Sequence, residues 1–409
     1  MTRQLRCLAG LVVLPALAAC SDSPGTAAVE ASPQVVFCRL LRPQGSGAIA
    51  QASDLCFGRV GSREGLWLVC DRNGAETAGR IFLFRPETLA AVVHRGDLAA
   101  DEEFHVAAPA EGWQAFAASR PWLDTDRLED LRRRVEAADP ASPGSRLDLE
   151  AVAPGRGPLP PHEWCLFAVS EEPYSLILQL RLEDRSPGAV STPARLVDLF
   201  CYPEADDEHG TDANDGLEGL AWAGRPGLFW WAEEGTRLHA PDAHPRLFFL
   251  EPRLGLGRLE DGRLKVDEPL SDRLTAAVRG LRTGPMQTLN ALTVAPDGTL
   301  LVVDRNGGRI CRVDPAAGTA AVWLDLHDIA GLDLRTLLAD FPDRRRMPYV
   351  SIEGIAVDDT GAVWLVDDPA MPEPFRRSCL VRLPARLPRA STRPAGGQPD
   401  LLDETSPVR

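Results

Sequence analysis

The sequence predicts an all-β protein built as a single β-propeller of four-stranded blades. A hairpin of two short apolar strands recurs five times, and further strands follow each copy. Gly and Pro, 35 of each, are frequent enough to end strands at turns. Antiparallel units that repeat at roughly 60–75 residues are typical of propeller blades. These observations place the whole chain in the all-β class.

The five hairpins share one pattern. Each begins with a polar carbonyl-bearing residue, continues through an apolar strand and a turn, and ends its second strand on an acid. APDGT and DDTG, in the last two copies, are favourable turns between antiparallel strands. The copies are SDLCFGRVGSREGLWLVCDR (53–72), DLEAVAPGRGPLPPHEWCLFAVSEE (148–172), GLEGLAWAGRPGLFWWAEE (216–234), LNALTVAPDGTLLVVDR (289–305) and SIEGIAVDDTGAVWLVDD (351–368).

Outer strands follow the hairpins. A third strand is expected in each unit, at 79–84, 175–182, 246–252, 308–314 and 378–383, and a fourth at 194–200 and 320–326. The last unit lacks a fourth strand, whereas an additional strand at 34–41 precedes the first unit. We therefore expect the N-terminal strand to complete the last blade and close the ring. Cys38 would then lie beside Cys379, and Cys56 beside Cys70, so both pairs are candidate disulfides.

The first interval between hairpins is the longest. It contains LEDLRRRVEAAD (128–139), expected as a surface helix, and GWQAFAAS (112–119), which would supply the inner strand of a degenerate extra blade. We favour five blades with a helical insertion at 97–147, and six blades is the alternative. The propeller then spans 34–384, and 385–409 reads as a disordered tail.

The N-terminus predicts export. Arg3 and Arg6 precede an apolar run that is too short to span a bilayer. The run ends in LAAC, which resembles a bacterial lipoprotein lipobox with Cys20 as the lipidated residue. Residues 1–19 would be the signal peptide and 20–33 a flexible tether. We expect an exported monomer, lipid-anchored in the cell envelope, at the outer membrane or periplasmic side if the organism is Gram-negative.

Composition excludes several function classes. The 409 residues carry a formal net charge of −15, and no basic stripe suits a nucleic acid. The sequence contains no GxSxG elbow, no phosphate-binding P-loop and no HExxH helix. An acidic balance fits a soluble protein or a cation-binding site.

The hairpins place polar residues at one end of the ring. Because antiparallel strands return to the same end, the start of the first strand and the end of the second should lie together. The first predicted ring is Asp54, Glu150, Glu218, Asn290 and Glu353, and the second is Asp71, Glu171, Glu233, Asp304 and Asp367. Carboxylates at this density need compensation, and hard oxygen donors suit Ca²⁺. The first ring is therefore the predicted calcium site.

The inner motifs LEAVA, LEGLA and IEGIA resemble those of exported propellers known as esterase-like phytase domains. They are more distantly similar to the propellers of gluconolactonases, paraoxonases and strictosidine synthases. The resemblance implies a central calcium site with hydrolysis of a phosphoester, ester or lactone above it. Glu150, Glu218, Asn290 and Glu353 match its motif positions, and Asp54 departs from the Glu-Gly form.

Two function hypotheses follow. The first is a calcium-dependent hydrolase of a small molecule, with a general base among Glu171, Glu233, Asp304 and Asp367 and with Arg72 and Arg305 contacting the substrate. The second is a non-catalytic propeller of the cell envelope, in which the ion is structural and the loops hold a ligand or a protein. Metal-dependent turnover separates the two.

Overall fold

The protein was analysed as a computed structural model. The structure describes residues 37–43, 49–71, 79–90, 96–137, 147–159, 161–171, 175–202, 216–239, 248–282, 287–326, 351–367 and 378–386, all within the unit Pro33–Arg409. The predicted signal peptide, Cys20, the tether, Arg72 and the tail beyond Arg386 lie outside the described residues. Among the described helices, none has the length and apolar character needed to cross a bilayer.

The described strands pair as five successive antiparallel groups of four strands, and we refer to each group as a blade. In order from the inner to the outer strand, these are β2 (Ala52–Val60), β3 (Arg63–Cys70), β4 (Arg80–Phe84) and β6 (Glu102–Ala107); β7 (Leu149–Arg156), β8 (Trp164–Ser170), β9 (Leu176–Leu182) and β10 (Thr192–Cys201); β11 (Leu217–Trp222), β12 (Leu228–His239), β13 (Phe248–Glu260) and β14 (Arg263–Val266); β15 (Leu289–Val294), β16 (Leu300–Asp304), β17 (Arg309–Asp314) and β18 (Thr319–Asp325); and β19 (Ile352–Val357), β20 (Ala362–Asp367), β21 (Cys379–Arg386) and β1 (Phe37–Arg42).

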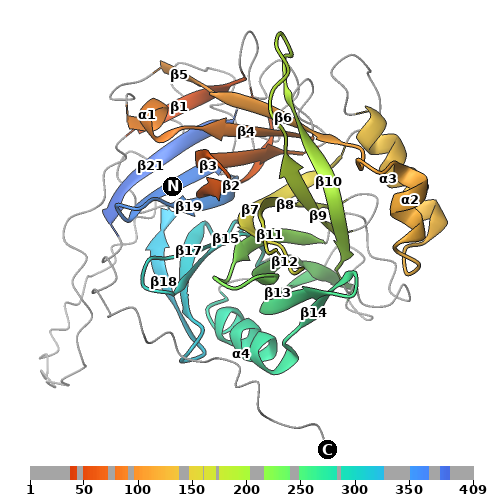
Figure 1. Ribbon diagram of the computed structural model, residues 1–409. Coiled ribbons are helices and arrows are strands. Elements are labelled where there is room, and N and C mark those ends of the chain that lie inside the picture. Colours follow the sequence, from red (N-terminus) through yellow and green to blue (C-terminus); the bar gives the residue numbers. More distant parts are fainter. Residues whose placement is uncertain are drawn as a thin grey trace, which may run out of the picture. The chain divides into compact units, whose positions relative to one another are not determined.

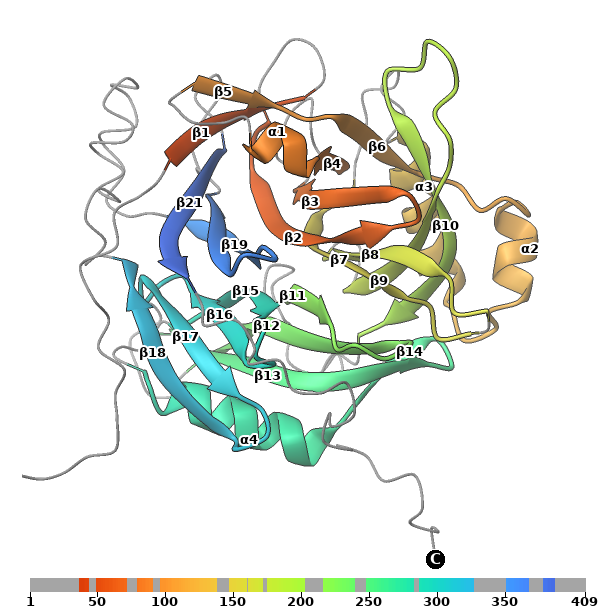
Figure 2. The same ribbon diagram turned by 60° about the vertical axis from the view of Figure 1, so that its left-hand side comes forward.

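The inner strands form a closed cycle. Contacts run from β2 to β7, β11, β15 and β19 and then back to β2. Figure 2 shows these five strands around the centre of the ring, with the outer strands at the periphery. The all-β propeller predicted from the recurring hairpins is confirmed.

Each hydrophobic cluster lies between two consecutive blades. Trp67 and Leu178 meet between the first and second blades, and Phe167 meets Trp231 between the second and third. Leu68 and Trp364 join the first blade to the fifth. Burial of each such aromatic side chain contributes roughly 1.5–3 kcal/mol of transfer free energy. The blades are therefore held to one another by side-chain packing on the faces of their sheets.

The N-terminal strand closes the ring as expected. β1 pairs antiparallel with β21, with Leu40 opposite Cys379 and Cys38 opposite Val381. Cys379 forms a disulfide, and Cys38 stands on the paired strand, although its side chain lies outside those described. The Cys56–Cys70 pairing is wrong, because neither cysteine forms a disulfide. Cys70 packs in the cluster shared with the fifth blade and Cys56 against the cluster shared with the second, so they face opposite sides of the sheet.

The segment predicted as an insertion begins with strands. β5 (Gly96–Ala99) pairs parallel with β1, and β6 is the outer strand of the first blade, so the sheet continues to Ala107. The segment 112–119 contains helix α2 (Trp113–Ala118) in place of the inner strand that a sixth blade would need. The expected surface helix is confirmed as α3 (Thr125–Ala137), which buries Leu131 and Val135 against the ring.

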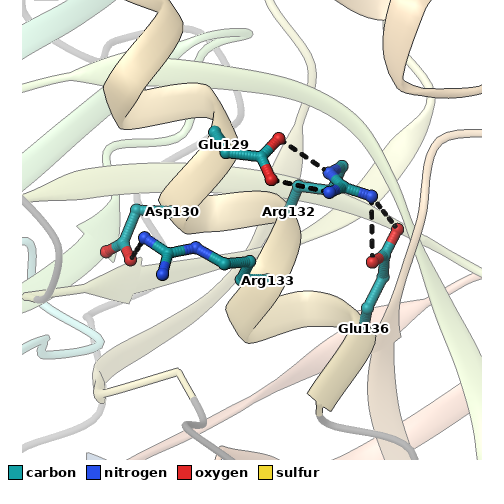
Figure 3. Close-up of polar contacts among 5 residues, drawn as sticks. All are labelled: Glu129, Asp130, Arg132, Arg133 and Glu136. Carbon is teal, nitrogen blue, oxygen red and sulfur yellow. Dashed lines mark hydrogen bonds and ion pairs between the residues drawn. The ribbon is translucent and has the colours of Figure 1, made fainter.

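The outer face of α3 is covered by ion pairs along the helix. Arg132 bonds Glu129 at 2.6 Å and Glu136 at 3.2 Å, and Arg133 bonds Asp130 at 2.8 Å (Figure 3). Pairs at this spacing stabilise a helix by about 0.2–0.5 kcal/mol each. They account for a charged helix at the surface without a binding role.

Besides α2, two helices were not expected from the sequence. α1 (Pro86–Ala90) follows β4, and α4 (Glu268–Arg279) packs against β13 (Figure 1). Asp267 caps α4 by accepting a hydrogen bond from the backbone N–H of Leu270, and Leu274 and Val278 face the cluster between the third and fourth blades.

Candidate metal and hydrolytic site

A β-bulge interrupts every inner strand near its first residue. Leu149 pairs with Ser170 and Ala151 with Val169, so Glu150 is the additional residue on β7. The same irregularity occurs in β2, β11, β15 and β19. A bulge re-aims the side chain that it contains. Repeated around the ring, it presents one polar residue per blade at the same end.

The position of the bulge shows that the predicted first ring is wrong by one residue in the first blade. Glu150, Glu218, Asn290 and Glu353 occupy the bulge as expected. In the first blade Ser53 holds this position, and Asp54 corresponds to the small residue that follows it in the other blades. Asp54 is 1% exposed, and its Oδ2 accepts a hydrogen bond from the N–H of Val152 on β7. Asp54 therefore joins two inner strands and does not occupy the bulge.

The predicted second ring mixes two strand positions. Glu233, Asp304 and Asp367 are paired with the residue before the bulge, as Cys70 and Ser170 are in the first two blades. Asp71 and Glu171 lie one residue further along the chain. Their equivalents are Glu234 and Arg305, and the fifth, Asp368, lies outside the described residues. Neighbouring residues on a strand face opposite sides of the sheet, so this offset separates two sets of side chains. The first set is Glu233, Asp304 and Asp367, and the second set is Asp71, Glu171, Glu234 and Arg305.

The first set is held by structural contacts. Glu233 accepts a hydrogen bond from the hydroxyl of Tyr202 at 2.8 Å, and Asp367 from the N–H of Cys379 at 2.6 Å. Asp304 has no exposed surface and accepts two bonds from Arg309, each at 3.0 Å. These three carboxylates fix strand ends and turns, which is a sufficient reason for an acid at each position.

The acids of the second set, the acids in the bulges and Asp148, which directly precedes β7, form a concentration of carboxylates that we call the acidic rim. The acidic rim consists of Asp71, Asp148, Glu150, Glu171, Glu218, Glu234 and Glu353. Burial raises the pKa of Glu218 well above its ordinary value, and the charges of Glu171, Glu234 and Glu353 raise it further. Burial also raises the pKa of Glu150, with additional contributions from the charges of Glu218 and Asp148. A bound cation would relieve both effects.

One part of the acidic rim has the geometry of a metal site. Asp71, Asp148 and Glu150 each offer a carboxylate oxygen, and these oxygens lie within 4.8 Å of one another. Asp71 and Asp148 are buried, and Glu150 is half-buried. Among the described residues this is where donor atoms converge, and all three donors are hard oxygens of the kind that Ca²⁺ prefers.

The buried amide of Asn290 is independent evidence that an ion or water belongs at this end of the ring. Its side chain is 1% exposed, and neither Oδ1 nor Nδ2 has a hydrogen-bond partner among the described residues. An unsatisfied buried amide costs about 1–3 kcal/mol. Asn290 sits in the bulge between Glu218 and Glu353 in ring order. An ion or water at the acidic rim would satisfy it, so the residues present fit a bound cation.

Arg305 lies within the acidic rim. Its Nη1 is 2.6 Å from Oε1 of Glu353, and its Nη2 is paired with Glu234. Ser351 also donates to Glu353 at 2.7 Å. Burial alone lowers the pKa of the Arg305 guanidinium, but Glu353 and Glu234 outweigh burial, and the pKa is raised. Arg305 is therefore a permanent positive charge at this end of the ring.

Sequence reasoning missed Asp148, Glu234 and Ser53 as rim positions. Glu234 is next to Glu233 and Asp148 lies two residues before Glu150, and nothing in the composition distinguishes these acids from the ones that were selected. The available signal was the run of an apolar, a polar and a small residue in LEA, LEG, LNA and IEG. Applied to the first blade, that pattern would have placed Ser53, not Asp54, at the rim.

The fold and this site define a class of protein, a β-propeller with a carboxylate-lined end suited to a divalent cation. The chain matches the phytase-like family model, described as esterase-like activity of phytase, over residues 49–369. It belongs to the phytase-like family. The comparison with curated proteins found no match.

Several solved structures show a weak overall likeness. A luciferin-regenerating enzyme is 9% identical, with 86% of this chain and 95% of that chain covered at a TM-score of 0.37. An aldose sugar dehydrogenase from Streptomyces coelicolor is 9% identical, covering 86% and 99%, with a TM-score of 0.37. The calcium-binding protein regucalcin from Agrobacterium tumefaciens is 12% identical, covering 80% and 72%, with a TM-score of 0.28. Likenesses this weak carry no argument about function.

Proposed function

We propose that this protein is a calcium-dependent hydrolase of a phosphoester, ester or lactone, with its site at the acidic rim. The observation that carries the proposal is the convergence of Asp71, Asp148 and Glu150 at the end of the ring where the bulge residues, including the unsatisfied amide of Asn290, also lie. Membership of the phytase-like family supports the hydrolytic class. Glu150, Asp71 and Asp148 would hold Ca²⁺, with Glu218 and Asn290 completing its surroundings.

Calcium bound there would polarise a substrate oxygen and lower the pKa of an adjacent water. The chain's own residues supply the remaining functions. Of the four carboxylates predicted as a general base, Glu171 is the one that belongs to the acidic rim, so we assign this role to Glu171. It accepts a bond from the N–H of Gly216 at 3.1 Å, which fixes one carboxylate oxygen. Arg305 stands at the same end to orient a negatively charged substrate group.

The test is turnover with and without metal. The purified protein is assayed on phytate, an aryl phosphate, an aryl ester and a lactone, with calcium or with EDTA. We expect hydrolysis of at least one substrate to depend on calcium and to fall about 100-fold or more in Glu150→Gln, the order expected when a main electrostatic group is lost. Glu163→Gln, at an exposed side chain paired with Arg181, is the matched control and should keep full activity.

Activity that ignores chelation would contradict the proposal. Bound calcium without turnover of any substrate in the panel would favour a binding propeller of the cell envelope.

We further propose that the chain is exported and anchored by a lipid on Cys20, on the strength of the LAAC motif. Mass spectrometry of the N-terminal peptide from membranes should find an acylated Cys20, and Cys20→Ser should release the protein into the soluble fraction. An intact N-terminus at Met1 in the membrane fraction would contradict this.

A further inference from the structure

Arg305 stands at a position where the other described blades carry acids. The residue that follows the strand pair at the bulge is Asp71 in the first blade, Glu171 in the second and Glu234 in the third. In the fourth blade the same position is Arg305. The fourth blade thus has a basic side chain at the position where the first three blades have a carboxylate, and this places Arg305 among negative charges.

The turn that carries Arg305 is built to hold it. Oδ1 of Asp304 accepts a bond from the N–H of Gly307 at 2.9 Å, and Oδ2 accepts from Arg309. The N–H of Asn306 donates to Thr288 at 3.3 Å. A Cβ at Gly307 would lie 2.4 Å from Oδ2 of Asp304, so the close approach requires glycine. Asp304 is therefore a positioning residue for Arg305.

The guanidinium of Arg305 bridges two blades. It pairs with Glu234 on β12, the second strand of the third blade, and with Glu353 in the bulge of the fifth. The side chains of Glu234 and Glu353 are 13% and 8% exposed, and that of Arg305 is 26% exposed. Charges this far from solvent are poorly screened. The ion pairs with Arg305 therefore make Glu234 and Glu353 less available to a metal ion.

We propose that Arg305 is a built-in cation that occupies the place of a second metal ion at the acidic rim. It neutralises Glu234 and Glu353 and restricts metal binding to the part of the rim that contains Asp71, Asp148 and Glu150. This inference rests on the proposed function, because it concerns the same site. The chemical reason is that a guanidinium and a divalent cation compete for the same carboxylate oxygens and repel each other when both are close.

The experiment counts bound metal. Wild type, Arg305→Gln and Arg305→Lys are equilibrated with calcium, and the bound ion is measured per chain by elemental analysis and by calorimetric titration. We expect one ion in wild type and in Arg305→Lys, which keeps the charge. Arg305→Gln should bind a second ion, since the guanidinium then no longer competes for the carboxylates of Glu234 and Glu353. In EDTA, Arg305→Gln should unfold at a lower temperature than wild type. Added calcium should remove this difference in unfolding temperature.

The outcomes separate this inference from the proposed function. If wild type and Arg305→Gln bind the same number of ions, the inference is wrong while the metal site stands. If wild type binds no calcium and Arg305→Gln binds one, the proposed function fails, and of the inference only the competition between Arg305 and a metal ion for Glu234 and Glu353 holds. If neither chain binds calcium, both are wrong.

A second variant covers the case in which Arg305→Gln does not fold. In the double substitution Glu234→Gln and Glu353→Gln, Arg305 keeps its charge but loses both partners. We expect one bound ion with an affinity reduced about tenfold, because the unpaired guanidinium repels it. Complete loss of the ion would show that Glu234 or Glu353 is a metal ligand and would overturn the proposal.

Discussion

Because of a difference of one residue in strand position, Asp54 is a buried side chain and not a residue of the bulge. Its carboxylate is buried between the inner strands of the first two blades, and its Oδ1 has no hydrogen-bond partner among the described residues. Burial raises the pKa of Asp54 well above its ordinary value, and the backbone N–H groups of Val152 and Leu55 offset that only in part. The side chain is therefore expected to hold its proton over much of the acidic range, where it acts as a neutral packing group.

Asp54→Asn should remove a pH-dependent loss of stability. A carboxyl with a raised folded-state pKa contributes fully below its unfolded pKa of about 3.9, and its contribution is lost as pH rises toward the folded value. Asparagine has the shape of the protonated acid and does not titrate. Urea unfolding at several pH values should show the variant gaining on wild type as pH increases from about 4.

Asp184→Asn, at an exposed residue of the loop after β9, is the control and should follow wild type at every pH. A constant difference between Asp54→Asn and wild type across this range would mean that Asp54 is ionised throughout.

At the scale of the element, β1 is the strand that closes the ring. Leu41 has no exposed surface and packs in the cluster between the first and fifth blades with Leu68 and Leu380. A strand that arrives from the other end of the chain must be held by side-chain packing and by pairing with β21, because no short connection fixes it.

Leu41→Ala should therefore lower the free energy of unfolding by about 2–5 kcal/mol, the range for a buried leucine. Val322→Ala is the matched control, since Val322 is 43% exposed on the outer strand of the fourth blade, and it should cost less than about 0.5 kcal/mol. Amide hydrogen exchange in β21 should accelerate in Leu41→Ala alone. Equal losses in the two variants would refute a closing role for β1.

At the scale of the whole molecule, the ring gathers acids from the first, second, third and fifth blades at one end. Strands far apart in the chain contribute Glu150, Glu218 and Glu353, and their mutual repulsion is a cost that only the closed ring creates. Because the pKa values of Glu150 and Glu218 are raised, the metal-free protein should lose stability as pH rises above about 4.3, the ordinary glutamate value.

Calcium should reverse that loss. At a free concentration 100 times its dissociation constant, a ligand specific for the folded state adds about 2.7 kcal/mol to the free energy of unfolding. Thermal unfolding at pH 8 should shift upward with calcium and return with EDTA. Glu150→Gln combined with Glu218→Gln should be more stable than wild type in EDTA and should not respond to calcium. An unchanged midpoint in wild type would argue against a cation at the acidic rim.

The sequence by itself determined the two inner strands of each blade, their grouping into hairpins and the closure by the N-terminal strand, because these depend on local periodicity and turn residues. It did not predict the outer strands β6 and β14. It also located Glu150, Glu218, Asn290 and Glu353, whose apolar, polar and small neighbours mark the bulge. Helices α2 and α4 were not predicted from the sequence, because their apolar residues are explained only by packing against the neighbouring sheet.

Only the tertiary structure decided which residue of each polar pair faces the acidic rim. Glu233 and Glu234 are adjacent in sequence, as are Asp304 and Arg305, and composition gives no preference within either pair. The bulge and the register of the second strand settle the choice, since side chains alternate between faces and a shift of one residue turns a rim group into a buried one. That register also placed a positive charge, Arg305, among the acids.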